Sequence, residues 1–177
     1  MESLADLAKK QETDKLHHGF CPHYESRFGY KRFDPITLLE IGTWKGGSLK
    51  MWREFFPNGK IVGIDHAPEW MPEPKDGIII EIGSQTDLAF LDRFAKAHGP
   101  FDFIVDDGGH TAIQHVVSFK ALWPHVKPGG WYCIEDLHSL YNICWTQPSE
   151  KTIFDLLHPQ TRTILIGGSD IIEVDTI

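Results

Sequence analysis

The segment "ITLLEIGTWKGGSLKMWREFF" (36–56) contains a short apolar run, a glycine-containing turn and an amphipathic helix pattern, in that order. The apolar run predicts a buried strand over 36–41 that ends at Gly42. The apolar side chains that follow have the spacing of one helix face: Leu49, Trp52, Phe55 and Phe56. A strand, a tight turn and a helix in succession are typical of the first half of a βαβ unit.

The same alternation continues along the chain. Further strands are predicted at 60–65, 78–82, 101–106 and 131–136, and "KPGG" (127–130) is predicted to be a turn. Helices are predicted over 86–99 and 111–126, and a short one near 149–158. The end of the sequence, 161–177, predicts an antiparallel pair of strands. The expected fold is therefore α/β and Rossmann-like: a mostly parallel seven-stranded sheet with helices on both faces.

Length and composition limit the class of protein. A chain of 177 residues, 41% hydrophobic and 24% charged, predicts one globular domain, 1–177, with an N-terminal helical or lid segment (1–33) and a core (34–177). The net charge of −8 and the lack of a basic patch argue against nucleic-acid and anionic-membrane partners. No run approaches the roughly 18 apolar residues of a membrane helix, so a cytoplasmic protein is expected. Homo-oligomerisation stays open.

Cysteine usage gives little sign of a structural metal or disulfide framework. The three cysteines, Cys21, Cys133 and Cys144, form an odd set without a CxxC spacing. This pattern argues against both a disulfide scaffold and a zinc site.

The glycine turn predicts a site for a nucleoside-type cofactor. Gly42 lets the backbone approach a ligand closely, and the helix start at Ser48 offers free N–H groups. Asp65 ends the next strand, where a carboxylate can accept both hydroxyls of a ribose. Trp44 stands where a dinucleotide fingerprint has its second glycine, which disfavours NAD. Glu40 and the turn suit the methionine end of S-adenosylmethionine, which has no phosphate.

Each of these residues also has a purely structural interpretation. The glycines can serve only a tight turn, and Asp65 can cap one. In "GSQTD" (83–87), Ser84, Gln85 or Asp87 can reach an adenine edge, or Thr86 or Ser84 can cap the next helix.

The segment 14–30, "DKLHHGFCPHYESRFGY", is rich in histidine and aromatic residues. It can fold over the cofactor as a lid with Lys15 and Tyr24 inside, or it can be a packed N-terminal helix. Both interpretations stay open.

Carboxylates follow two strands that should be neighbours in the sheet. "FDFIVDDGGH" (101–110) and "WYCIEDLH" (131–138) place Asp107, Glu135 and Asp136 at adjacent strand ends. Three carboxylates in one cleft repel one another unless a cation or a proton compensates. Hard oxygen ligands of this kind favour Mg²⁺ or a similar ion. His110 can then take a proton from a hydroxyl that the metal has acidified, and Asp106 is expected to border the cofactor.

The alternative is again structural. Asp106 and Asp107 can be turn formers, His110 a helix N-terminal residue and Asp136 a cap. The repetition of the pattern at two adjacent strand ends favours the metal interpretation for the set.

These motifs resemble one family, the class I S-adenosylmethionine-dependent O-methyltransferases of the macrolide-sugar type, which includes mycinamicin- and macrocin-like enzymes. The cephalosporin hydroxylase-like methyltransferases are more distant relatives. The resemblance runs from about Leu4 to Tyr141 and does not include the family's long N-terminal substrate-binding domain. It rests on "TDK" (13–15), "LEIGTWKGGSLKMW" (39–52), "FPNGKIVGID" (56–65), "GSQTD" (83–87), "FDFIVDDGGH" (101–110) and "SFKALWPHVKPGGWYCIEDLHSLY" (118–141).

The resemblance implies an activity and a set of roles. Asp107, Glu135 and Asp136 would hold Mg²⁺, and His110 would be the general base. The methyl acceptor would be a hydroxyl on a sugar or a glycosylated small molecule. Three alternatives remain: methylation of a catechol, an NAD(P)-dependent reductase, and a fold relative without catalytic activity.

Overall fold

The protein is described by a computed structural model that covers residues 1–141, 151–156, 163–164 and 171–175. Five strands form a parallel sheet: β1 (Thr37–Ile41), β2 (Lys60–Asp65), β3 (Ile78–Ile82), β4 (Phe101–Asp106) and β5 (Val126–Ile134). Two strands extend it in the antiparallel direction, β7 (Ile171–Asp175) and β6 (Thr163–Ile164). The sheet order is β3-β2-β1-β4-β5-β7-β6. The predicted Rossmann-like parallel sheet is confirmed, and the two tail strands pair with each other as expected.

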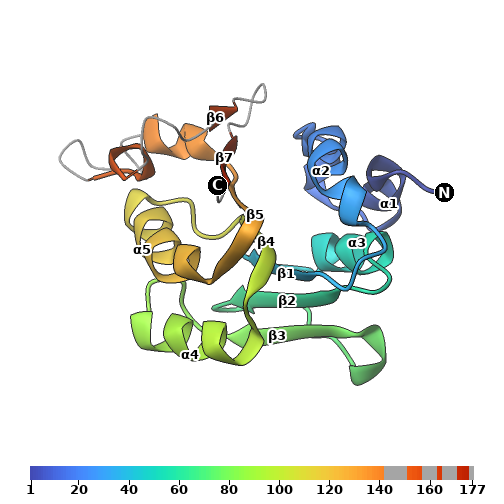
Figure 1. Ribbon diagram of the computed structural model, residues 1–177, viewed down its shortest axis with the longest axis horizontal. Helices are drawn as coiled ribbons and strands as arrows, with labels where there is room; N and C mark the ends of the chain where they lie inside the picture. The colour runs from blue at the N-terminus through green and yellow to red at the C-terminus, as the bar shows by residue number, and fades with distance from the viewer. Residues whose placement is uncertain (142–150, 157–162, 165–170, 176–177) are drawn as a thin grey trace.

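Helices cover both faces of the sheet, as predicted (Figure 1). One face carries α1 (Leu4–Lys10), α2 (Phe20–Phe28) and α3 (Gly47–Phe55). The other carries α4 (Leu88–His98) and α5 (Ala112–Leu122). Short 3₁₀ turns lie at Asp14–Leu16, Gly29–Lys31, Pro74–Asp76, Trp123–His125, Leu137–Tyr141 and Ile153–Asp155. A short helix was expected near 149–158; within the described residues 151–156 only the 3₁₀ turn Ile153–Asp155 is present, and the rest of that range lies outside the described residues. None of the helices in the described ranges is long and apolar enough to cross a membrane.

One strand begins earlier than the sequence suggested. "KPGG" (127–130) was predicted to be a turn, but β5 already starts at Val126 and runs through it. The pairing with β4 shifts register between Phe101 and Phe103, and Gly129 has a φ of 73°. Two steps along β4, from Phe101 to Phe103, face five steps along β5, from Val126 to Trp131. A bulge of this kind accommodates turn-forming residues within a strand because it adds residues without ending the pairing.

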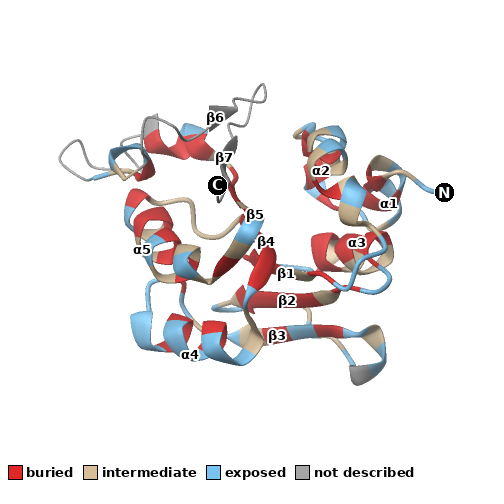
Figure 2. Ribbon diagram, in the orientation of Figure 1, coloured by how far each residue is buried: buried red, intermediate tan, exposed pale blue. Residues whose placement is uncertain are grey.

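The N-terminal segment is part of the core. Phe20, Tyr24 and Phe28 are buried on α2, and the Phe28 ring stacks on Phe103 of β4 at 4.1 Å between centroids. Trp52 of α3 meets the Tyr24 ring edge-on at 5.4 Å. Figure 2 shows the buried faces of these helices directed at one another. Burial of each large aromatic contributes about 1.5–3 kcal/mol, so the structure favours the packed-helix alternative for 14–30.

A buried carboxylate joins three segments at the end of the sheet opposite to the strands' carboxyl ends. Asp102 of β4 accepts hydrogen bonds from Lys31 Nζ (3.0 Å), Lys127 Nζ (2.6 Å) and the Thr37 backbone N–H (2.9 Å). Burial by itself would raise the pKa of Asp102, but these three donors outweigh it and lower the pKa below 3.8.

We predict that Asp102→Ala lowers the free energy of unfolding by about 2 kcal/mol at pH 7, because it leaves two lysines and a backbone N–H without their acceptor. The pKa of this carboxyl is lower in the folded than in the unfolded chain. Its stabilisation is therefore present above pH 3.8 and is lost as the pH falls through the folded-state pKa. Urea unfolding from pH 7 toward pH 3 should show the gap between wild type and variant closing.

Asp92→Ala is the matched control, since Asp92 pairs with Lys96 on the exposed face of α4. An exposed pair of this type contributes about 0.3–0.5 kcal/mol. Equal losses for the two variants would contradict the structural role of Asp102.

Candidate active site

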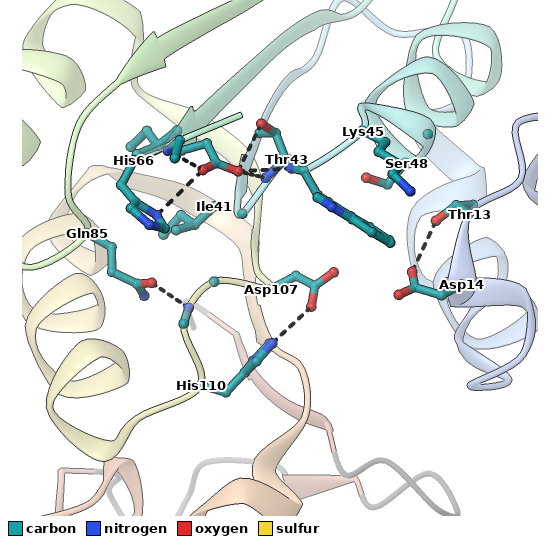
Figure 3. Close-up of a pocket in the computed structure, with 18 of the residues that line it drawn as sticks. Thr13, Asp14, Ile41, Thr43, Lys45, Ser48, His66, Gln85, Asp107 and His110 are labelled. Atoms are coloured by element: carbon teal, nitrogen blue, oxygen red, sulfur yellow. Dashed lines mark hydrogen bonds and ion pairs between the residues drawn. The ribbon is translucent and has the colours of Figure 1, made fainter. Parts of the chain in front are cut away.

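A pocket of about 830 Å³ lies at the carboxyl ends of the parallel strands. The loops that follow β1, β2, β3, β4 and β5 all contribute to its lining, and residues 11–14 close one side (Figure 3). The strand order reverses between β1 and β4, and ligands of open α/β sheets bind in the crevice at such a switch point. The pocket is therefore where the fold would bind a cofactor.

The loops after β1 and β4 are in direct contact at Gly42. A Cβ at this position would lie 2.0 Å from the Asp107 carbonyl oxygen, and Gly42 has a φ of 83°. The Asp107 N–H in turn donates to the Ile41 carbonyl (2.9 Å). Glycine is thus required at position 42 by both conformation and space, because the loop after β4 approaches it closely.

Asp65 holds the glycine loop. Its Oδ2 accepts from the N–H groups of Thr43 (2.7 Å) and Trp44 (2.9 Å), and its Oδ1 accepts from Ala67 N–H (2.8 Å). Burial by itself would raise the pKa of Asp65, but the backbone donors outweigh it and lower the pKa. Asp65 lines the pocket and also serves as the turn cap that the structural interpretation described.

Gln85 bridges the loop after β4 to the strand below it. Its Oε1 accepts from Gly109 N–H (2.7 Å), and its Nε2 donates to Asp106 Oδ1 (3.2 Å). Asp106 is fully buried and also accepts from the hydroxyls of Ser118 and Tyr132. Gln85 therefore lines the pocket, whereas Asp106 lies beneath it and does not reach the lining.

The cap of α4 is a different residue from those predicted. Asp87 is the N-cap, and its side chain accepts from Ala89 N–H and Phe90 N–H. The hydroxyls of Ser84 and Thr86 lie 2.9 Å apart and bond to each other. The alternative that Ser84 or Thr86 is the N-cap was wrong, because the helix starts at Leu88, two residues after the predicted start at position 86.

Three potential metal ligands converge at the ends of β4 and β5. One ligand atom from each of Asp107, His110 and Asp136 lies within 4.8 Å of the others. His110 Nε2 is 3.9 Å from Asp107 Oδ1 and 3.6 Å from Asp136 Oδ2. Figure 3 shows Asp107 and His110 directed toward each other at the pocket wall.

The donor set fits a hard divalent cation. Asp136 Oδ1 is buried and has no hydrogen-bond partner within the described ranges, although His18 Nδ1 and His138 Nδ1 lie 3.6 and 3.8 Å from it. A buried carboxylate oxygen without a donor is unfavourable unless a cation approaches it. Two carboxylates on one wall of the pocket, with the His110 imidazole beside them, leave room for water or substrate oxygens as further ligands.

Glu135 has other partners. Lys15 Nζ donates to both of its carboxylate oxygens (2.8 and 2.9 Å), and the Tyr24 hydroxyl donates to Oε1. The same ammonium lies 2.7 Å from Asp107 Oδ2 and 3.1 Å from Glu40 Oε1. Lys15, Tyr24, Glu40 and Glu135 therefore form a buried layer under the pocket, outside its lining.

Burial sets the protonation of this layer. It raises the pKa of Glu40 to about 7 and, together with the charge of Asp107, raises the pKa of Glu135 well above its usual value. Burial would lower the pKa of Lys15, but the three carboxylates outweigh it, so Lys15 remains an ammonium ion. The Lys15 ammonium is thus a single buried cation in contact with three carboxyl groups, those of Glu40, Asp107 and Glu135.

Backbone strain is concentrated around the pocket. Among the described residues, the non-glycine residues with positive φ are Glu12 (55°), Trp44 (38°), His110 (56°) and Asp136 (57°). All of them line the pocket. Such conformations cost about 1–3 kcal/mol each and persist where the surrounding structure enforces them, most often at functional sites.

Several lining residues were not predicted: Gln11, Thr13, Asp14, Lys45, Lys50 and His66. Trp44, which in the sequence argues against a dinucleotide, also lines the pocket, and the residue is 55% exposed. The turn "GTWKGG" carried a signal for Trp44 and Lys45. Nothing local to residues 11–14 indicates that they reach the strand ends, because their position depends on the packing of α1 against α3.

Fold and site together define a Rossmann-like protein with a pocket at the switch point of the strand order. A family model described as a methyltransferase domain matches residues 39–137. The chain is 44% identical over 147 residues to the 8-demethyl-8-(2-methoxy-alpha-L-rhamnosyl)-tetracenomycin-C 3'-O-methyltransferase of Streptomyces olivaceus. It is 42% identical over 147 residues to the mycinamicin VI 2''-O-methyltransferase of Micromonospora griseorubida. The chain therefore belongs to the methyltransferase-domain family.

These matches cover 78% of this chain but 37% of each relative, so the chain spans less than two fifths of their length. Among solved structures, the MycE methyltransferase in complex with Mg, SAH and mycinamycin VI superposes with a TM-score of 0.84 at 33% identity. That match covers 98% of this chain and 54% of the MycE chain. The predicted family resemblance is confirmed.

We predict that Gly42→Ala destabilises the protein by several kcal/mol, because the new methyl group would meet the Asp107 carbonyl and the loop would have to move. Denaturant unfolding measures the loss. Gly129→Ala is the matched control, since Gly129 has a similar φ of 73° but nothing within 4 Å of the added Cβ. That variant should lose only about 1 kcal/mol, and an equal loss in both variants would contradict the close approach.

Proposed function

We propose that this chain is the catalytic domain of a metal-dependent O-methyltransferase. It would transfer the methyl group of S-adenosylmethionine to a hydroxyl of a sugar or glycosylated small molecule. The observation that carries the proposal is the convergence of His110 Nε2 with Asp107 and Asp136 on the wall of a pocket at the β1/β4 switch point. The names of the relatives and the Mg and SAH of the MycE complex support it.

The cofactor would occupy the part of the pocket between the glycine loop and β2. Among the described residues, Asp65 Oδ1 accepts one hydrogen bond, from Ala67 N–H, which leaves it a lone pair for a ribose hydroxyl. Gly42 and Ser48 would contact the methionine end, with Glu40 below them. Gln85 lies on the side of the pocket where the adenine would fit.

Asp107 and Asp136, joined by Glu135, would hold a magnesium ion. An ion bound there supplies a Lewis acid that acidifies the acceptor hydroxyl and neutralises the carboxylates. His110 Nε2 faces this position and would accept the hydroxyl proton. The oxygen–methyl bond would form as the sulfur–methyl bond breaks, which leaves S-adenosylhomocysteine. Holding acceptor and cofactor in line would lower the activation free energy of methyl transfer by roughly 7–11 kcal/mol at best.

We also propose that residues 1–177 act as one domain on the seven-stranded sheet, with 1–33 as its helical N-terminal part. A small-molecule acceptor suits the pocket, which has a volume of about 830 Å³ and is lined by residues 11–14 as well as by His110. A cytoplasmic location is proposed from the absence of any apolar segment long enough to span a bilayer in the sequence.

Ligand binding tests the cofactor and metal together. We predict that S-adenosylhomocysteine binds to wild type in calorimetry, and that Asp107→Ala weakens Mg²⁺ binding by at least about tenfold because it removes a ligand. Asp14→Ala is the matched control, since Asp14 lines the same pocket outside the ligand cluster. Absence of S-adenosylhomocysteine binding, with and without Mg²⁺, would rule out the proposed function.

Turnover tests the general base. We predict that His110→Ala lowers kcat about a hundredfold to ten-thousandfold and leaves S-adenosylhomocysteine affinity unchanged. The assay measures methyl transfer to a panel of glycosylated acceptors and to a simple catechol. His125→Ala, which changes a histidine in the 3₁₀ turn Trp123–His125 outside the pocket lining, should keep wild-type turnover. Full activity of His110→Ala would refute its role, and transfer to catechol alone would refute a sugar acceptor.

A further inference from the structure

We propose that the Lys15 ammonium is an internal counter-ion that occupies the position of the divalent ion between Asp107 and Glu135, and that metal binding displaces it. The inference rests on the metal site proposed above. It concerns how the protein keeps that site folded without metal and how tightly the site binds a metal.

The contacts of Lys15 are those of a bound cation. Its side chain is 1% exposed, and Nζ lies 2.7 Å from Asp107 Oδ2, 2.8 and 2.9 Å from the two Glu135 oxygens and 3.1 Å from Glu40 Oε1. An ammonium ion has three protons to donate. These contacts use all of them on carboxylates, so Lys15 neutralises part of a charge that would otherwise oppose folding.

Glu135 is the residue that this arrangement withholds from the metal. It directly precedes Asp136, yet it is absent from the ligand group formed by Asp107, His110 and Asp136. Both of its oxygens are directed to Lys15 instead. A Mg²⁺ ion requires its oxygen ligands at about 2.0–2.1 Å. Asp107 still presents Oδ1, because Lys15 contacts its Oδ2, but a metal that recruits Glu135 must compete with the ammonium for both Glu135 oxygens. Two cations side by side also repel each other, so metal binding favours release of the ammonium.

Lys15 also connects the metal site to the N-terminal segment. It sits in the 3₁₀ turn Asp14–Leu16 between α1 and α2, and the neighbouring residues 11–14 line the pocket. Release of the ammonium therefore removes the buried ion pairs that hold this turn against β4 and β5. The turn at the pocket mouth would become more accessible when the metal is bound.

Metal titration of a Lys15→Met variant tests the proposal. Methionine keeps an apolar side chain of similar length but removes the competing charge. We expect Mn²⁺ to bind on the order of tenfold more tightly to Lys15→Met than to wild type. Calorimetry without cofactor or acceptor measures the two affinities. Lys10→Met is the matched control, because Lys10 pairs with Glu54 on the surface of the same N-terminal segment. Its Mn²⁺ affinity should equal that of wild type.

The outcomes separate this inference from the proposed function. If Mn²⁺ binds to wild type and Lys15→Met within twofold, or more weakly to the variant, Lys15 does not compete and the inference is overturned. If neither protein binds Mn²⁺, even with S-adenosylhomocysteine present, the proposed metal site fails and the inference fails with it.

A second measurement uses the wild-type protein alone, so it tests the proposal even if Lys15→Met does not fold. Trypsin cleaves after lysine, and Lys15 is buried whereas Lys9 and Lys10 are exposed. We expect Mg²⁺ to increase the rate of cleavage after Lys15 relative to cleavage after Lys9 and Lys10, as measured by mass spectrometry of the fragments. An unchanged or lower relative rate at saturating Mg²⁺ would contradict displacement.

Discussion

The close approach of Gly42 to the Asp107 carbonyl is the constraint on which the pocket depends. The loops after β1 and β4 meet at a position where no Cβ fits, and the Asp107 N–H is held by the Ile41 carbonyl. This contact fixes the start of the segment that carries His110. On the other side, Asp65 fixes the glycine loop through backbone N–H groups. Backbone contacts therefore fix the loops that carry the proposed reacting groups, and the shape of the pocket does not depend on the side chains of those groups.

Charge is the second constraint, and it explains why the N-terminal segment belongs to the core. Carboxylates at adjacent strand ends are unfavourable in a buried layer unless a cation compensates. Here the cation comes from Lys15, 92 residues before Asp107 and 120 before Glu135 in the chain. The aromatic packing of α2 against Trp52 and Phe103 places the preceding turn where its ammonium can reach these groups. Packing thus positions the charge, and the charge in turn makes the acidic layer stable.

The sequence predicted what local patterns encode. The strands ending at Asp65 and Asp106 were located to the residue, because apolar runs bounded by glycine and acidic residues have few alternatives. The position of His110 beside Asp107 and Asp136 followed from the parallel order of β4 and β5. The ion pairs of Lys15 had no local signal, since they join residues across most of the chain. The early start of β5 was missed for a related reason: a bulge against β4 overrode the turn preference of "KPGG".

The residues whose backbone conformations depart from local preference lie around the pocket. His110 and Asp136 both adopt left-handed backbone conformations, which are uncommon for residues other than glycine. The Ser139 hydroxyl donates to the His110 carbonyl at 2.6 Å, which ties the strained turn after β4 to the turn after β5. In this conformation the imidazole and the Asp136 carboxylate face each other across 3.6 Å. Because the backbone already holds this geometry before a ligand arrives, little reorganisation is needed at the moment of reaction. The stability that the aromatic core contributes therefore offsets the conformational cost of holding these two side chains in place.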